Sequence, residues 1–230
     1  DKSAYKEGMV LGDIWGLQFD RFLTEDDFNA DGSLKAGLPD QTKVFPAGYQ
    51  FAPGDVLYKD LDNNGEIVKQ TNTNDKGDLS VIGNALPRLQ FGLNLDAAWK
   101  GFDISMFFQG VAKRKLWAAG NQVLPGFTTG EPFYKGAEDY WTPENTDAFY
   151  PRPMDYKQSA SGNYSVNDRY LLNMAYLRLK TFTVGYSLPK VWLSKFKVQG
   201  LRVYFTGENL FTIDGVKPAI DPEIGIRTAS

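Results

Sequence analysis

The chain has 230 residues, 28 acidic and 25 basic, and its formal net charge of −3 excludes the extended basic surface that nucleic-acid binding requires. It contains no Cys and no His, which excludes disulfides, thiolate nucleophiles, Cys- or His-ligated metal sites and Ser–His catalysis. Aromatic residues make up 14%, with 23 Gly and 12 Pro, and this composition favours strands and turns over a helical bundle. No apolar run approaches the roughly 18 residues that a transmembrane helix needs.

The first half of the chain contains three segments in which apolar and polar residues alternate. Within residues 9–22, five apolar residues share one parity and predict a strand: Met9, Leu11, Trp15, Leu17 and Phe19. The alternation is longest over 88–100 and resumes over 102–111. Lys100 and Gly101 lie between these two runs, and a two-residue link containing Gly predicts a tight hairpin turn.

The second half contains another pair of predicted strands, over 171–188 and 198–210. Within the first of them the apolar parity changes by one residue near Lys180–Phe182, which predicts a β-bulge there. Residues 189–197 form a short connection between the two strands.

The connections alternate between long and short. Long loops are expected over 23–87, 112–170 and 211–230, and loops of this length are uncommon in compact soluble domains. The rings that flank the short connections are typical of an interfacial girdle: Trp99, Phe102, Tyr186, Trp192 and Phe196. The pattern predicts an all-β fold whose antiparallel, up-and-down strands form part of a large transmembrane outer-membrane β-barrel, with long extracellular loops and short periplasmic turns. The alternative is a secreted carbohydrate-binding β-sandwich, whose strands alternate in the same way.

Short motifs along the chain resemble, in the same order, those of SusC/RagA-type TonB-dependent outer-membrane transporters. They are Pro53-Gly54-Asp55, Tyr58-Lys59-Asp60, Tyr140-Trp141-Thr142-Pro143-Glu144-Asn145, Tyr150-Pro151-Arg152, Tyr176-Leu177-Arg178-Leu179-Lys180, Gly185-Tyr186-Ser187-Leu188-Pro189, Leu201-Arg202-Val203-Tyr204, Gly207-Glu208-Asn209-Leu210 and Asp221-Pro222-Glu223. The resemblance covers most of the chain and corresponds to the C-terminal part of the family's barrel.

The resemblance implies a barrel with an N-terminal plug that imports oligosaccharides, or in some members peptides. It also implies a SusD-like surface lipoprotein as partner and energy relayed by TonB. We expect residues 1–230 to be a fragment, a C-terminal segment of such a barrel without the plug or the TonB-contacting part. Its expected location is the outer membrane of a Gram-negative bacterium of the Bacteroidetes type, in contact with membrane lipid.

One loop matches the first half of a calcium-binding loop. Oxygen ligands at the first, third and fifth positions and a backbone carbonyl at the seventh converge on one ion, and the candidates are Asp60, Asp62, Asn64 and Glu66. The twelfth position is Thr71 instead of Glu, so Asp75 or Asp78 is a candidate substitute. A structural Ca²⁺ in loop 60–71 is weighed against a solvated turn.

The loop over 112–170 is rich in aromatic residues with carboxylates and an arginine nearby. Such rings stack on sugar faces, or they pack against one another or against the lipoprotein. The candidate substrate-binding residues are Trp117, Tyr134, Tyr140, Trp141, Tyr150 and Arg152.

Catalysis would rest on carboxylate pairs such as Glu138/Asp139 or Asp221/Glu223, as in a glycosidase. Nothing in the sequence indicates that either pair faces across a cleft, so we predict that the protein is not an enzyme.

Overall fold

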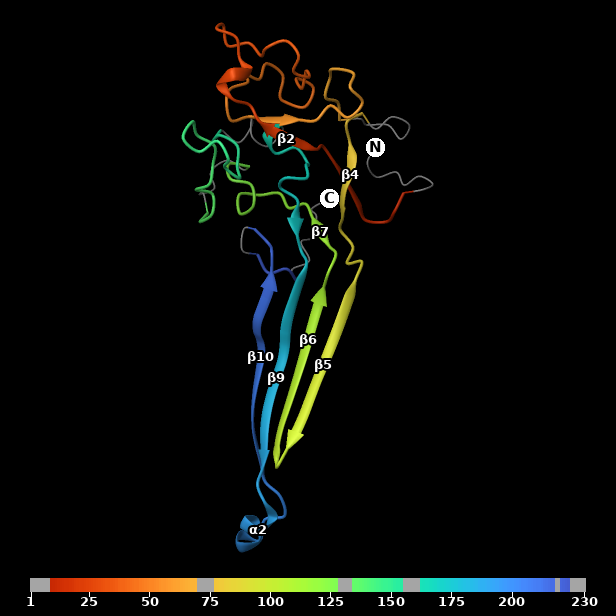
Figure 1. Ribbon diagram of the computed structural model, residues 1–230, viewed down its shortest axis with the longest axis vertical. Coiled ribbons are helices and arrows are strands. Elements are labelled where there is room, and N and C mark those ends of the chain that lie inside the picture. The colour runs from red at the N-terminus through yellow and green to blue at the C-terminus, as the bar shows by residue number, and fades with distance from the viewer. Residues whose placement is uncertain (1–8, 70–76, 128–133, 155–161, 218–219, 224–230) are drawn as a thin grey trace.

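A computed structural model describes residues 9–69, 77–127, 134–154, 162–217 and 220–223. A long four-stranded sheet carries an irregular head at one end and a short helical link at the other (Figure 1). Within the described residues no helix is long and apolar enough to cross a membrane.

The long sheet is an antiparallel meander in the spatial order β10-β9-β6-β5. Its strands are β5 (Gln90–Trp99), β6 (Phe102–Val111), β9 (Tyr176–Ser187) and β10 (Arg202–Asp214). Because neighbours in space follow one another in sequence, the up-and-down arrangement predicted from the alternation is confirmed.

The two short connections lie at the same end of the sheet, away from the head (Figure 1). Lys100 and Gly101 join β5 to β6 with φ angles of 48° and 89°. A Cβ on Gly101 would lie 3.0 Å from the carbonyl oxygen of Ser187 in the neighbouring strand, so the turn requires glycine there. The link from β9 to β10 contains α2 (Lys190–Leu193) and η3 (Ser194–Phe196).

The pairings of β9 with β6 and with β10 are both irregular at the same level of the sheet. β6 pairs with β9 on either side of Lys180, but Lys180 itself has no partner in β6, as the change of parity predicts. The pairing with β10 shifts between Glu208 and Phe211, where Asn209 adopts a φ of 51°. The two bulges keep most apolar side chains of the four strands on one face, although Phe107 of β6 lies on the other.

The register aligns the apolar residues of the four strands in rows across one face. The middle row consists of Leu95, Met106, Phe182 and Gly207. The row nearest the short connections consists of Trp99, Phe102, Tyr186 and Val203. The opposite face carries polar rows, such as Asp96, Ser105, Thr183 and Thr206. One face of the sheet is therefore apolar along its length.

The length of the apolar face matches the hydrocarbon core of a bilayer. The ten residues of β5 span about 33 Å when extended, or about 23 Å at a 45° tilt, close to the apolar band of roughly 25 Å on membrane barrels. Phe205 on this face is 63% exposed, and no second sheet covers the face within the described part of the chain. The β-sandwich alternative is therefore wrong, because it requires this face to be buried between two sheets.

On the polar face, an arginine of β10 reaches across β9 to bond with β6. Arg202 Nη2 donates to Asp103 Oδ2 at 2.6 Å and Nε donates to Oδ1 at 3.0 Å. The guanidinium passes over Gly185 in β9, where a Cβ would lie 2.6 Å from it. The polar face thus begins, near the turns, with a paired charge that spans β10 and β6.

The predicted strand over 9–22 is corrected by the structure. It forms two short strands in the head, β1 (Asp13–Gly16) and β2 (Phe19–Phe22), and neither joins the long sheet. Between them the backbone of Leu17 bonds to the 166–168 segment, its amide donating to Val166 O at 2.9 Å. This pairing interrupts the run that alternation alone describes as continuous.

The segments predicted as long loops contain short elements of their own. These are η1 (Glu25–Asp27), β3 (Val56–Tyr58), β4 (Ser80–Asn84) and β7 (Lys115–Leu116). The strand predicted over 171–188 is divided into β8 (Leu172–Asn173) and β9. β1 pairs with β4, β2 with β3, and β7 with β8. The segments over 23–87 and 112–170 therefore fold into a packed head.

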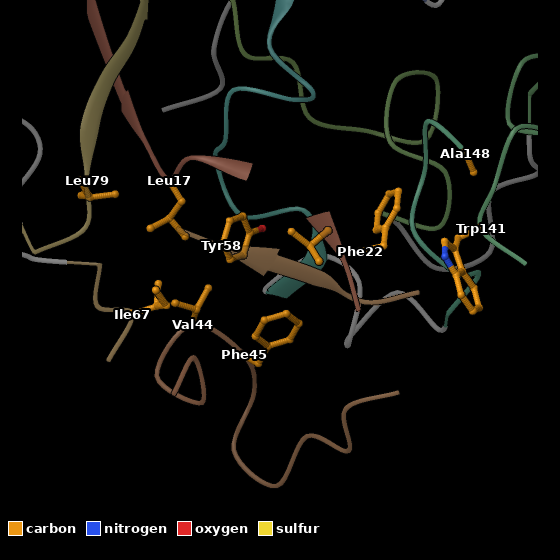
Figure 2. Close-up of a cluster of buried hydrophobic side chains, with 10 residues drawn as sticks. Leu17, Phe22, Val44, Phe45, Tyr58, Ile67, Leu79, Trp141 and Ala148 are labelled. Atoms are coloured by element: carbon orange, nitrogen blue, oxygen red, sulfur yellow. The ribbon is translucent and has the colours of Figure 1, made fainter. Parts of the chain in front are cut away.

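The head has two apolar cores. The first contains Leu17, Phe22, Val44, Phe45, Val56, Tyr58, Ile67, Leu79, Trp141 and Ala148. Figure 2 shows Leu17, Val44, Tyr58 and Ile67 gathered around a common centre. The second contains Leu116, Ala118, Val123, Leu124, Tyr150, Tyr164, Tyr170, Leu172, Met174 and Val216. Each core draws residues from segments far apart in sequence, so packing fixes the chain where regular pairing does not.

A buried side-chain amide completes the pairing of β3. Gln41 is fully buried, its Nε2 donates to Val56 O at 2.8 Å, and its Oε1 accepts from the amide of Tyr58 at 3.2 Å. On the same strand the amide of Val56 donates to Asn163 Oδ1 at 2.8 Å. These bonds replace a strand neighbour, which explains how three residues form a fully buried strand.

We predict that Met106→Arg, in the middle apolar row, sharply lowers the amount of folded full-length protein in the outer membrane. A charge at the bilayer midplane costs about 2–4 kcal/mol on a barrel's lipid face. Heat-modifiable migration in detergent gels measures the folded fraction. Ser105→Arg is the control, because residue 105 faces Asp96 and Thr183 on the polar face. Equal folding of the two variants would contradict the assignment of the faces.

Candidate functional site

A cavity with a volume of about 680 Å³ lies in the head. Its lining is Pro125, Tyr134, Lys135, Ala137, Glu138, Tyr140, Tyr150, Pro151, Pro153 and Tyr164. Four tyrosines and three prolines dominate, with one lysine and one glutamate. The volume falls within the range of roughly 300–1,000 Å³ typical of ligand sites.

The base of this tyrosine pocket is held rigidly. Tyr150 is 4% exposed, its hydroxyl donates to Val123 O at 3.0 Å, and its ring stacks on Tyr170 at 6.0 Å between centroids. The ring of Tyr164 meets Tyr170 edge-on at 5.3 Å. Burial, with the nearby charge of Asp139, raises the pKa of Tyr150 to about 12. The base therefore presents a neutral aromatic surface at physiological pH.

The rim of the pocket is open to solvent. Tyr134 and Tyr140 are 42% and 40% exposed. Lys135 and Glu138 provide one charge of each sign. Exposed rings above a rigid floor suit stacking against flat faces of a ligand, while the hydroxyl and charged groups supply hydrogen bonds.

Three of the predicted substrate-binding residues, Tyr134, Tyr140 and Tyr150, thus meet in one cavity. Trp117 lies elsewhere, half-buried on a smaller cavity of about 230 Å³. Tyr164 and the three lining prolines were not among the predicted substrate-binding residues. Tyr164 reaches the pocket through the second core of the head, and no local pattern of the sequence indicates that contact.

Arg152 lies in a buried polar network. Its Nε donates to Asp55 Oδ1 at 2.8 Å, and the Asp55 side chain is fully buried. Tyr49 Oη and Asn163 Nδ2 donate to the same oxygen at 2.8 and 3.0 Å. Although burial opposes the charged form, the bonds to Asp55 raise the pKa of Arg152, so this cation stays charged. The geometry gives Arg152 a structural partner inside the head.

Trp141 lies in the first core, 7% exposed, against Gly54. Gly54 has a φ of 90°, and a Cβ there would lie 2.5 Å from the indole ring and 2.8 Å from Cβ of Arg152. The amide of Arg152 donates to Gly54 O at 3.0 Å. The motifs at 53–55, 140–145 and 150–152 therefore meet at one junction, which positions Tyr140 and Tyr150 at the pocket.

The predicted calcium ligands are only partly gathered. Carboxylate oxygens of Asp60, Asp62 and Asp78 lie within 4.8 Å of one another. Asp78 is one of the two residues proposed to replace the missing glutamate. The other, Asp75, and Thr71 at the twelfth position lie outside the described residues.

The side chains of the remaining two predicted ligands make other contacts. Asn64 Oδ1 accepts from the amide of Glu66 at 2.8 Å, and the carboxylate of Glu66 pairs with Lys43. Asp60 Oδ1 is buried without a hydrogen-bond partner among the described residues. Loss of solvation and the neighbouring acidic groups Asp60 and Asp78 raise the pKa of Asp62. Three close carboxylates with an unused oxygen form a cluster that a cation would stabilise.

The carboxylates considered for catalysis make different contacts, and Asp221 and Glu223 both pair with Arg178. Asp221 accepts from Arg178 Nη2 at 2.7 Å, and Glu223 accepts from Lys180 Nζ at 2.7 Å. These ion pairs attach the 220–223 segment to β9. Glu138 lines the tyrosine pocket, whereas its neighbour Asp139 lines a different cavity.

No family model matches the sequence. The chain is 29% identical over 228 residues to TonB-dependent receptor P3 of Formosa agariphila, covering 96% of this chain and 19% of the relative. It is 25% identical over 210 residues to TonB-dependent receptor SusC of Bacteroides thetaiotaomicron, covering 87% of this chain and 20% of SusC. The chain therefore spans about a fifth of the length of these relatives.

The fold matches a chain of the RagAB peptide transporter with a TM-score of 0.57 at 18% sequence identity. The match covers 91% of this chain and 20% of the RagAB chain. At this identity the likeness shows the fold, and it confirms the all-β, antiparallel architecture predicted from the alternating strands.

We predict that Gly54→Ala destabilises the head, because the new methyl group meets the Trp141 ring at 2.5 Å in addition to straining a positive φ. Gly48→Ala is the matched control, since Gly48 has a φ of 76° with no atom near its Cβ. The expected cost is about 2–4 kcal/mol for Gly54→Ala and about 1 kcal/mol for Gly48→Ala. The melting temperature of the purified full-length protein measures both, and equal shifts would refute the junction.

Proposed function

This chain belongs to the SusC/RagA-type TonB-dependent receptors of the bacterial outer membrane, and we propose that it is part of the wall and extracellular head of a nutrient importer. Its cargo is an oligosaccharide or a peptide. The importer works with a SusD-like lipoprotein on the cell surface and receives energy through TonB. The activity is transport, without a covalent step.

The observation that supports the proposal most strongly is the tyrosine pocket in the head. With short connections at the periplasmic end of the sheet, the head lies on the extracellular side, where a nutrient first arrives (Figure 1). The pocket is lined by rings and prolines, with a single charge of each sign. Such a surface binds by stacking and by a few hydrogen bonds, as recognition of either a sugar chain or an extended peptide requires.

The rigid base favours binding over mere packing. Tyr150 and Tyr164 are fixed by Tyr170, so a ligand does not have to order them. Tyr134 and Tyr140 remain exposed and are free to contact a ligand. A capture site of this kind requires neither His nor Cys, in agreement with the composition.

We predict that the double variant Tyr134→Ala/Tyr140→Ala binds cargo about tenfold more weakly, because truncation removes two stacking surfaces worth roughly 0.5–1.5 kcal/mol each. Calorimetry on the full-length protein with its lipoprotein partner measures the affinity. The probes are neutral glucan and galactan oligosaccharides and a tryptic digest of casein, which distinguish a sugar cargo from a peptide cargo.

Leu11→Ala is the control for this measurement, because Leu11 is 62% exposed and does not line the pocket. It should leave the affinity unchanged. Unaltered binding by the double tyrosine variant would show that these rings do not contact the cargo and would remove the pocket from the proposal.

We also propose that the cluster of Asp60, Asp62 and Asp78 binds a structural Ca²⁺. The close carboxylates and the unpartnered Asp60 oxygen support this assignment. A cation there would join the 60–66 turn to residue 78, whose carboxylate already accepts from the amides of Leu61 and Val68 at 2.8 and 2.7 Å.

We predict that calcium raises the melting temperature of the chelator-treated full-length protein, because an ion that binds only the folded state stabilises it. A dissociation constant of about 10⁻⁴–10⁻³ M is typical of extracellular modules. Asp62→Asn should weaken binding at least about tenfold, because it removes one ligand charge. Asp31→Asn, at an exposed turn outside the cluster, should not. No calcium-dependent shift in the unaltered protein would refute the site.

A further inference from the structure

The end of the sheet that carries the short connections is strongly basic. Lys100 lies in the first connection, and Lys190, Lys195 and Lys197 lie in the second. All four are exposed, and none forms an ion pair within the described residues. The link over 188–201 contains no acidic residue. In a chain of net charge −3, positive charge is thus concentrated at one tip.

The same tip exposes large apolar side chains. Val191 and Trp192 of α2 are 75% and 60% exposed, although the neighbouring Leu193 is buried. Val198, further along the link, is 42% exposed. α2 therefore uses one residue to pack against the protein and turns an adjoining apolar surface outwards. Exposing such an apolar surface to water is unfavourable, and no described segment covers it.

The exposed apolar surface of the tip continues that of the sheet. Leu188 and Leu201 have the parity of Tyr186 and Val203, and the amide of Leu188 donates to Leu201 O at 2.9 Å. Leu201 is 47% exposed. The apolar rows of the sheet therefore lead directly into the link, without a polar row between them.

The first connection shows the same combination of an aromatic ring and a lysine. Trp99 is 70% exposed in the last apolar row, and Lys100 Nζ lies 4.7 Å from the centroid of its ring. A tryptophan at the limit of the hydrocarbon with an ammonium group just beyond it is the arrangement that places both at a membrane interface.

We propose that the tip formed by Lys100 and residues 188–201 binds the headgroups of anionic phospholipids in the periplasmic leaflet of the outer membrane. The apolar residues of α2 enter the interface, and the four lysines contact headgroup phosphates. This inference rests on the membrane placement in the proposed function, but not on the identity of the cargo.

Charge and continuity favour a lipid surface over a protein partner. The lysines are dispersed over two connections and have long flexible side chains, which suits a fluid layer of phosphates better than one fixed acidic site. The apolar surface of the tip adjoins rows that already face hydrocarbon. Asp103, three residues after Lys100 in the chain, is engaged by Arg202 and does not neutralise the lysines.

The test uses the full-length protein in nanodiscs of phosphatidylcholine alone or mixed with phosphatidylglycerol. A Val191→Cys variant, in a background without other cysteines, carries an environment-sensitive fluorophore. We expect quenching by lipids labelled near the headgroup, stronger in the anionic nanodiscs and reduced at high salt because salt screens the lysines. Retained lipid, measured by mass spectrometry, should be enriched in phosphatidylglycerol.

The triple variant Lys190→Gln/Lys195→Gln/Lys197→Gln should reduce this enrichment at least about tenfold, since each lysine near an anionic surface contributes of the order of 1 kcal/mol. The matched control is Lys35→Gln/Lys59→Gln/Lys113→Gln, which removes three exposed lysines elsewhere in the chain and should leave the enrichment unchanged. A fluorophore that is insensitive to lipid quenchers would overturn the proposal, as would an enrichment that the tip variant retains. Failure of cargo binding would leave this result unaffected.

Discussion

The structure depends on one constraint: four strands place most of their apolar side chains on the same face, and no other part of the described chain covers that face. A second protein layer would have to bury rings such as Phe205 at 63% exposure, whereas hydrocarbon accepts them as they are. The remaining features follow from this requirement. Polar residues are confined to the opposite face, Arg202 and Asp103 are paired there, and bulges correct the parity wherever a strand would otherwise turn a polar side chain outwards.

The head is stabilised in a different way, because its strands are short. Side chains do much of the work that backbone pairing does in the sheet: Gln41 completes the pairing of β3, and Asp55 gathers Arg152, Tyr49 and Asn163 around one carboxylate. Such a network is stable only when every member is present, since a buried carboxylate without its partners is costly. Its completeness explains how segments almost a hundred residues apart hold the tyrosine pocket in one shape.

Sequence reasoning succeeded where the pattern is set by local backbone geometry. The alternation over 88–111 identified β5, β6 and the Lys100-Gly101 turn, and a single change of parity located the bulge at Lys180. It failed at 9–22, because alternation does not reveal which partner a strand selects and this segment pairs within the head. The site was also only partly predictable. Aromatic richness indicated a binding loop, but burial of Trp141 against Gly54 is a long-range contact that composition does not encode.

Under the proposed function, the separation of roles between sheet and head also indicates where cargo specificity would lie. Side chains on the apolar face are committed to hydrocarbon, and near the head the polar face of β9 is engaged by the chain itself, where Arg178 pairs with Asp221. Neither surface can change its side chains freely to suit a new cargo. Side chains of the pocket rim are free to change, because Tyr134 and Tyr140 are exposed and take no part in the buried network. If the pocket binds cargo as proposed, the apolar wall and the buried network of the head leave the rim as the surface on which differences in cargo would be encoded.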